Sequence, residues 1–123
     1  MNDTARRTVD QSRSAPGAVR LAVVEGAAAG QEFKMDNVAT IGRSPEATIM
    51  IDDPGVSRLH ARIRRGSVGM FELEDMGSKN GTFLNGVRIE HALVKLSDKI
   101  RLGPRVVLTL ASFDLVEEQV VQR

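Results

Sequence analysis

Short apolar runs separated by turn residues follow one another along most of this chain and limit the folds that it can adopt. In one run Leu59, Ala61 and Ile63 alternate with basic neighbours, and in another Phe71 and Leu73 alternate with acidic ones. This period of two is typical of half-buried β-strands, and no stretch predicts a helix of about ten residues or more. Short strands at a spacing of about 8 to 12 residues indicate an all-β fold, an antiparallel β-sandwich.

The strongest local signal is Asn85-Gly86, which lies between two short apolar runs and predicts a tight β-hairpin. Pairing the basic run with the acidic run would set opposite charges across a strand ladder. We expect strands within 19–24, 31–35, 38–41, 48–51, 59–64, 71–74, 82–84, 87–89, 99–102 and 106–110, and 113–116 could extend the last one.

The two ends of the chain differ from this pattern. Residues 1–18 are rich in Arg, Ser, Thr and Asp and close with Pro16-Gly17, so we expect a disordered tail. The folded domain is expected over 19–116, followed by a C-terminal extension over 117–123 that could form one helical turn.

Composition excludes several classes of function. The formal net charge of +1 provides no bulk basic field for nucleic acid or for a membrane surface. The chain has no Cys, which excludes disulfides and Cys-ligated metals, and the lack of Trp and Tyr with only 4 Phe argues against an aromatic platform for single-stranded nucleic acid. No apolar run approaches the roughly 20 residues that cross a bilayer, and no secretory signal is present, so we expect a cytoplasmic location.

Small, polar and cationic residues are concentrated in turn-like segments between the apolar runs. Hydroxyls, amides and guanidinium groups on loops that a β scaffold holds in place form a site for a compact anion. The segments are Gly42-Arg43, then SRLH at 57–60, then GSKNGT at 77–82, and finally Asn85-Gly86.

This ordered set of motifs resembles the forkhead-associated (FHA) domain, and the resemblance covers roughly residues 19–115. It implies a sandwich of the FHA type with binding loops at one end. It also implies a phosphothreonine-peptide binding module, a non-catalytic adaptor that acts downstream of a Ser/Thr kinase and binds a phosphorylated protein or peptide. No cofactor and no metal are expected.

Five residues are expected to bind the phosphopeptide. Arg43 offers paired donors to two phosphate oxygens, Ser57 offers a hydroxyl, and Arg58 adds charge and a backbone donor. Lys79 stands where the family commonly has Thr or Ser, and it would act as a mobile point charge. Asn80 matches the family residue that hydrogen-bonds the peptide main chain beside the phosphothreonine.

Five further residues are expected to support the site. Gly42 would permit a close approach of another chain segment. The resemblance implies that His60 braces the phosphate-binding loop by hydrogen bonds. Gly81, Asn85 and Gly86 are assigned to turns.

Other readings remain open at this stage. The same fold could serve as a phosphate-independent interaction module, and Ser57 with His60 could suggest a hydrolase, although no third orienting residue is recognisable. Arg62, Arg64 and Arg65 could bind nucleic acid. Asp52, Asp53, Glu74 and Asp75 could be imagined as a metal site, but we expect them to stabilise turns and to pair with the arginines.

Thr8 follows two arginines in the N-terminal tail, a pattern that resembles substrates of basic-directed Ser/Thr kinases. A phosphorylated Thr8 could reach the binding loops of its own domain or of a neighbouring copy and compete with other phosphopeptides. The alternative is a tail with no such role.

Overall fold

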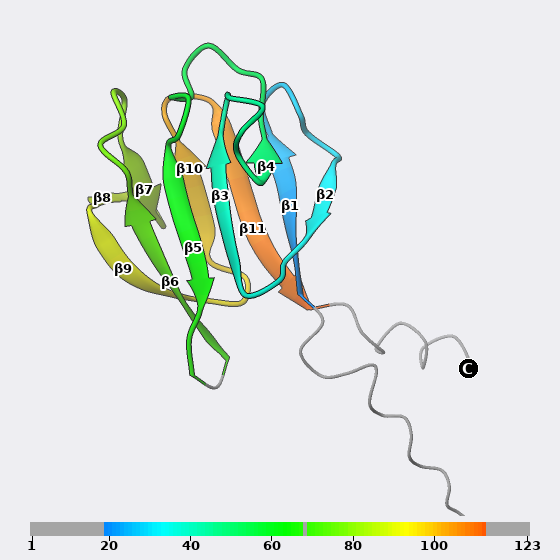
Figure 1. The fold of residues 1–123 in the computed structure, drawn as a ribbon. Coiled ribbons are helices and arrows are strands. Elements are labelled where there is room, and N and C mark those ends of the chain that lie inside the picture. The colour runs from blue at the N-terminus through cyan, green and yellow to red at the C-terminus, as the bar shows by residue number, and fades with distance from the viewer. Residues whose placement is uncertain (1–18, 68, 113–123) are drawn as a thin grey trace, which may run out of the picture.

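The computed structural model describes residues 19–67 and 69–112, which form two β-sheets packed face to face as a sandwich (Figure 1). The strands are β1 (Val19–Glu25), β2 (Glu32–Lys34), β3 (Val38–Gly42), β4 (Ile49–Met50), β5 (Ala61–Arg65), β6 (Met70–Asp75), β7 (Thr82–Leu84), β8 (Val87–Ile89), β9 (His91–Lys95), β10 (Lys99–Leu102) and β11 (Val106–Ser112). One sheet has the order β2-β1-β11-β10-β7-β8 and the other β4-β3-β5-β6-β9. The predicted β-sandwich is therefore confirmed.

Alternation along the strands builds the core between the sheets. In β1, Val19, Leu21 and Val23 are at most 6% exposed, and in β11 the partner of Leu21 is the equally buried Leu110. The opposite sheet contributes further buried apolar side chains to the same core, and fully buried Ile63 in β5 is one of them. Burial of these apolar side chains is the main favourable contribution to folding.

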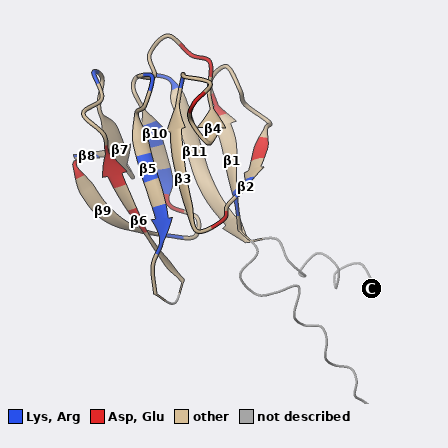
Figure 2. Cartoon of the chain, viewed as in Figure 1, with Lys and Arg blue, Asp and Glu red and all other residues tan. Residues whose placement is uncertain are grey.

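The predicted charge ladder lies on the outer face of the β5–β6 pair. Arg62 is opposite Glu74 and Arg64 is opposite Glu72 in the antiparallel register, and both pairs form ion pairs. Figure 2 shows the two halves of this ladder as Lys and Arg positions, coloured blue, along β5 beside Asp and Glu positions, coloured red, along β6. The arginines of this face are thus neutralised locally by their cross-strand partners.

The predicted hairpin at Asn85-Gly86 joins β7 to β8. Both residues have positive φ, 49° and 89°, as a type I′ turn requires. The Asn85 side chain accepts from the Lys99 backbone N–H at 2.9 Å and donates to the Asp98 carboxylate at 3.1 Å. This turn therefore also links the hairpin to the start of β10.

Three details differ from the sequence-based expectation. β4 has two residues and pairs in parallel with β3, so one pair in this sheet is not antiparallel. β9 was not predicted, because the contiguous apolar residues 92–94 hide its alternation. The alternation of buried apolar and exposed polar residues that was expected from Leu59 onward is reversed at its first two residues, since Leu59 is 39% exposed and His60 is fully buried. These two residues belong to the loop before β5, where strand periodicity does not apply.

The strand directions bring the polar loops together at one end of the sandwich. Ala61, the first residue of β5, pairs with Ile41 near the end of β3 and with Asp75 at the end of β6. The segments 43–60 and 76–81 must therefore lie side by side, at the end opposite to Val19 and Ser112 (Figure 1). The tail predicted over 1–18, the possible strand extension over 113–116 and the C-terminal extension predicted over 117–123 lie outside the described residues.

The two leucines 73 and 93 offer a test of this packing. We expect Leu73→Ala to lower the free energy of unfolding by about 2–5 kcal/mol, because the side chain is fully buried between the sheets. Leu93 is 57% exposed on the neighbouring strand β9, and Leu93→Ala should change it by about 0.5 kcal/mol or less. Denaturant unfolding measures both, and equal losses would contradict the assigned register.

Candidate functional site

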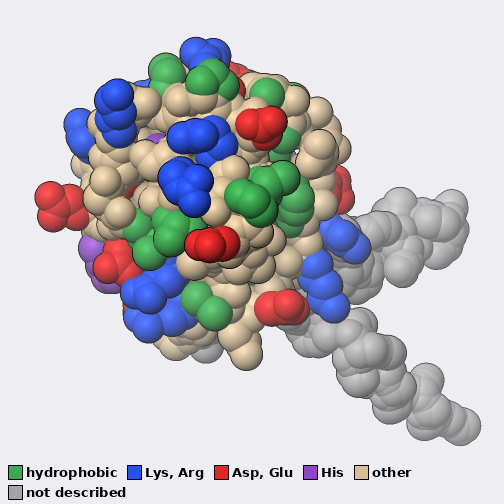
Figure 3. Space-filling model, turned by 45° about the horizontal axis from the view of Figure 1, so that its top comes forward, with side chains coloured by type: hydrophobic (Ala, Val, Ile, Leu, Met, Phe, Trp, Pro, Cys, Tyr) green, Lys and Arg blue, Asp and Glu red, His purple; other side chains and the backbone are tan. Residues whose placement is uncertain are grey.

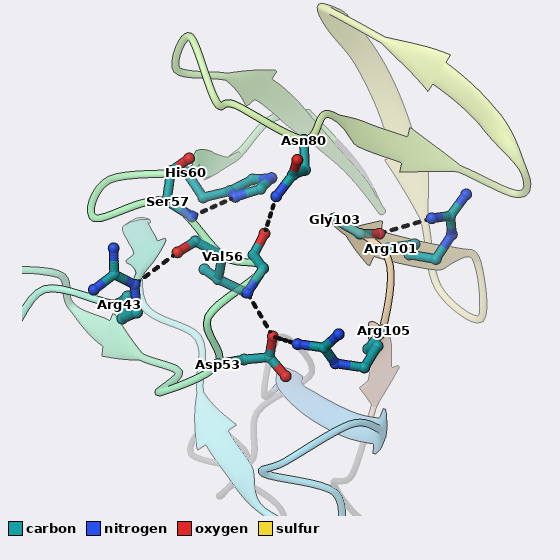
Figure 4. A network of polar contacts seen from close by, with 10 residues as sticks. Arg43, Asp53, Val56, Ser57, His60, Asn80, Arg101, Gly103 and Arg105 are labelled. Carbon is teal, nitrogen blue, oxygen red and sulfur yellow. Dashed lines mark hydrogen bonds and ion pairs between the residues drawn. The ribbon is translucent and has the colours of Figure 1, made fainter.

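Arg43, directly after β3, is held by its backbone and by one side-chain nitrogen. Its N–H donates to the Ser57 carbonyl and its Nε to the Val56 carbonyl, both at 2.9 Å (Figure 4). Within residues 19–67 and 69–112, the two terminal nitrogens bond no other group, and the residue is exposed. The guanidinium is therefore anchored at one corner and presents its paired donors to solvent.

Gly42 is required by a close approach between β3 and the loop that precedes β5. A Cβ atom at this position would lie 2.0 Å from the Arg58 carbonyl oxygen. The same carbonyl accepts a hydrogen bond from the Ser44 N–H at 3.1 Å. Any side chain at position 42 would push the two loops apart and move Arg43 away from Ser57.

Ser57 joins the two polar loops through its hydroxyl. Its Oγ accepts from the Lys79 backbone N–H at 2.9 Å, which leaves the hydroxyl proton available for another acceptor. The side chains of Lys79 and Arg58 are exposed at this end. Three cationic side chains and one hydroxyl thus surround the junction of the loops.

Asn80 links the β6–β7 loop to the segment that precedes Ser57. Its Nδ2 donates to the Gly55 carbonyl at 3.0 Å (Figure 4). Its Oδ1 and second amide proton bond none of the described residues. The carboxamide is exposed and retains one donor and one acceptor, the pair needed to bind a peptide main chain.

His60 is fully buried beneath these loops. Its Nδ1 accepts from the Ser57 N–H at 3.0 Å, so the proton resides on Nε2, which donates to the Gly81 carbonyl at 2.8 Å. Burial lowers the pKa of His60, and the bond to Gly81 and the charge of Asp75 offset this only in part. The neutral imidazole therefore braces the two loops, and a protonated ring could not accept from Ser57.

Asp75 organises the β6–β7 loop, a larger role than the turn residue that the sequence predicts. Its carboxylate accepts from the backbone N–H groups of Gly77 and Ser78 and from the hydroxyls of Ser78 and Thr82. Burial raises the pKa of Asp75, but these hydrogen bonds outweigh it and hold the pKa below its usual value. The Asp-x-Gly-Ser pattern was the available signal, because Asp before Gly favours such side-chain turns.

A second carboxylate, Asp53, shapes the other loop. It is 3% exposed and accepts from the Gly55 N–H at 2.8 Å and from Arg105 at 2.9 Å. Figure 4 shows Asp53 and Arg105 on the far side of the loop from Arg43. No local sequence signal predicted this pair, because its members are 52 positions apart.

The other residues expected to support the site lie at opposite ends of β7. Gly81 lies at the junction, where its N–H donates to the Ser78 hydroxyl at 3.0 Å. Asn85 and Gly86 lie at the other end of β7, away from these loops, and act in the hairpin turn already described.

The described part of the chain forms neither the hydrolase site nor the metal site that the sequence left open. His60 uses both ring nitrogens for backbone groups, and its Nδ1 faces the Ser57 N–H instead of the hydroxyl. No three His, Asp or Glu side chains of residues 19–67 and 69–112 gather as a metal site. Over the same ranges, no helix is long and apolar enough to cross a membrane.

Comparisons with known proteins agree with this geometry. The FHA domain family profile matches residues 39–103. The oxoglutarate dehydrogenase inhibitor of Corynebacterium diphtheriae is 41% identical over 71% of this chain and 61% of its own length. The FHA domain of the CT664 protein from Chlamydia trachomatis has a TM-score of 0.72 and is 30% identical, over 78% of this chain and 98% of that one.

A further solved structure comes from an analysis of phosphothreonine-dependent FHA domain interactions. It has a TM-score of 0.68 and 28% identity, and the match covers 80% of this chain and 99% of that one. The chain therefore belongs to the FHA domain family. It spans 54 to 61% of the length of the curated relatives that it matches.

The hydrogen bonds of His60 predict a pH dependence of stability. The pKa is lowered in the folded protein, so between that pKa and the unfolded value near 6.5 the unfolded chain binds more protons. Stability should therefore fall as the pH decreases through this window. His60→Ala should cost about 1–3 kcal/mol at pH 7 and remove this part of the pH dependence.

The free energies of unfolding of the unchanged protein and of His60→Ala, measured at pH 7 and pH 5.5, test this prediction. His91→Ala serves as the control because the His91 side chain is 60% exposed. A pH dependence that survives in His60→Ala and disappears in His91→Ala would contradict the assignment.

Proposed function

We propose that this chain binds phosphothreonine peptides and acts as a non-catalytic adaptor downstream of a Ser/Thr kinase. The observation that carries the proposal is the state of Arg43, whose side chain is fixed through Nε while its terminal nitrogens stay available, and whose backbone is bonded to Ser57. A donor group held in place before the ligand arrives loses little conformational freedom on binding. The binding domain would comprise residues 19–116.

The donors at the loop junction match the demands of a phosphate. A phosphorylated side chain carries about −1.5 to −2 charges at neutral pH and has three strong acceptor oxygens. Arg43 and Ser57 supply directed donors, and Arg58 and Lys79 add positive charge. Asn80 then holds the peptide main chain. The membership in the FHA family and the phosphothreonine-dependent relative support this assignment.

Binding without catalysis is supported by the state of His60. A general base must reach the proton that it removes, and this imidazole is engaged with Ser57 N–H and the Gly81 carbonyl. The donors at the junction can bind an anion, but they include no base and no metal ligand set. These observations support the proposal of an adaptor that binds without catalysis and uses no cofactor.

Nucleic acid is disfavoured as the partner by the pairing of the basic strand. Arg62 and Arg64 are each bonded to a glutamate of β6, and Arg65 lies over the Phe71 ring at 5.1 Å. Counterion release on a polyanion requires cations that are not already neutralised. We therefore propose a phosphorylated protein of the cytoplasm, and not nucleic acid, as the partner.

Arg43→Ala tests the site directly. It should weaken the binding of a phosphothreonine peptide about 10- to 150-fold, because about 1.5–3 kcal/mol of charge-assisted bonding is lost. Arg64→Ala is the matched control, since it removes the same charge from an exposed ion pair on the outer face of β5. Titration calorimetry on both variants measures the difference.

Two results would contradict the proposal. The first is equal affinity of Arg43→Ala and Arg64→Ala for the phosphopeptide. The second is equal binding of the phosphorylated and unphosphorylated peptides to the unchanged protein, which would favour the phosphate-independent interaction module.

The proposal extends to Thr8 in the N-terminal tail. Val19 lies at the end of the sandwich opposite to the loops, and the seven residues of β1 span about 23 Å (Figure 1). The ten residues between Thr8 and Val19 reach at most about 36 Å when extended. A phosphorylated Thr8 could thus reach the site of its own domain or of a neighbour, at an effective concentration of the order of millimolar.

A competition experiment tests whether phosphorylated Thr8 occupies the binding site. Protein phosphorylated at Thr8 should bind a reference phosphothreonine peptide more weakly than protein lacking residues 1–18. The Thr8→Ala variant, treated with the same kinase, is the control. Equal affinity of the phosphorylated and truncated proteins, with the phosphorylated form monomeric, would leave the tail without this role.

A further inference from the structure

An open hollow lies beside the candidate site, between the β1–β2 loop and the end of β4. Its volume is about 320 Å³, within the range of ligand pockets. Ala27, Ala28 and Gln31 line it on one side, and Met50 and Asp52 line it on the other. On this end of the molecule, hydrophobic side chains lie next to Lys and Arg side chains (Figure 3).

The backbone pairing places the hollow next to Arg43. Met50 is the register partner of Gly42, and the Ile51 N–H donates to the Gly42 carbonyl at 2.8 Å. Ser57 bonds the backbone of Arg43 itself. The order across the end of the sandwich is therefore the hollow, then Arg43, then Ser57 and the loop that carries Asn80.

The walls of the hollow combine apolar surface with one free carboxylate. Met50 is 48% exposed, although it lies in a strand whose other residue is buried. Asp52 is exposed and forms no ion pair with residues 19–67 or 69–112, whereas the adjacent Asp53 is buried and paired with Arg105. An apolar wall ending in a carboxylate fits a side chain with an apolar stem and a cationic head.

We propose that this hollow binds an arginine or lysine side chain of the phosphothreonine ligand, with the stem on Met50 and the charged head at Asp52. Neighbouring strands are about 4.8 Å apart and an extended peptide advances about 3.3 Å per residue. The hollow lies beyond β4, one to two strand spacings or about 5 to 10 Å from β3, so the cationic residue stands about two or three positions from the phosphothreonine, on the side away from Asn80. This inference rests on the proposed function, because it places the phosphate at Arg43.

An arginine scan tests the proposal. Seven phosphothreonine peptides are compared by calorimetry on the full chain: one with alanine at all flanking positions and six with a single arginine between −3 and +3. We expect about three- to tenfold tighter binding for arginine about two or three positions away, on one side of the phosphothreonine alone. Glutamate at the same position should weaken binding, because it would face Asp52.

Variants at Asp52 assign the effect to this carboxylate. Asp52→Asn should abolish the gain from arginine but leave the affinity for the alanine-flanked peptide unchanged, and Asp52→Lys should reverse the preference from arginine to glutamate. Asp36→Asn is the matched control, because Asp36 is an exposed carboxylate in the turn between β2 and β3, at the other end of the sandwich.

The outcomes separate this inference from the proposed function. Binding that depends on the phosphate, with no gain from arginine at any position, overturns the inference and leaves the proposed function intact. A gain that persists in Asp52→Asn also overturns it. Loss of the phosphate dependence in the alanine-flanked peptide overturns both.

Discussion

The imidazole of His60 is the group on which the geometry of the binding loops depends. Its backbone N–H donates to the Ile41 carbonyl of β3 and its carbonyl accepts from the Met76 N–H, while its ring joins Ser57 to Gly81. One buried residue thus ties together β3 and both polar loops. Because an unpaired polar group at this depth is costly, each of these bonds restricts where the loops can lie.

Around this brace, the two loops are held mostly by backbone groups and by the carboxylates of two aspartates, and few of the exposed cations take part. Asp75 satisfies the donors of one loop, and Asp53 orders Gly55 in the other. Arg43 contributes its Nε to the framework and keeps its terminal nitrogens free. Because some groups hold the loops and others stay available, the donors are arranged before a charged ligand binds, which reduces the entropy lost on binding.

In the proposed complex, the hollow at Met50 and Asp52 would extend this arrangement beyond the phosphate. Phosphate contacts alone distinguish a modified residue from an unmodified one, but they carry no information about the residues around it. A neighbouring wall with one unpaired carboxylate can supply such information. The β4 strand matters for this reason despite its short length, because its pairing with β3 places Met50 beside Gly42.

Local patterns in the sequence determined the strand content, the hairpin at Asn85-Gly86 and the charge ladder of β5 and β6, because strand periodicity and turn chemistry are properties of neighbouring residues. The resemblance to the FHA domain, and not a local pattern, indicated which polar residues would meet, and the binding roles of Arg43, Ser57 and Asn80 stay predictions. Tertiary structure alone decided the burial of His60, the pairing of Asp53 with Arg105 and the hollow beside β4. Each of these depends on which strands pair and which loops touch, and such contacts join residues tens of positions apart that no local pattern relates.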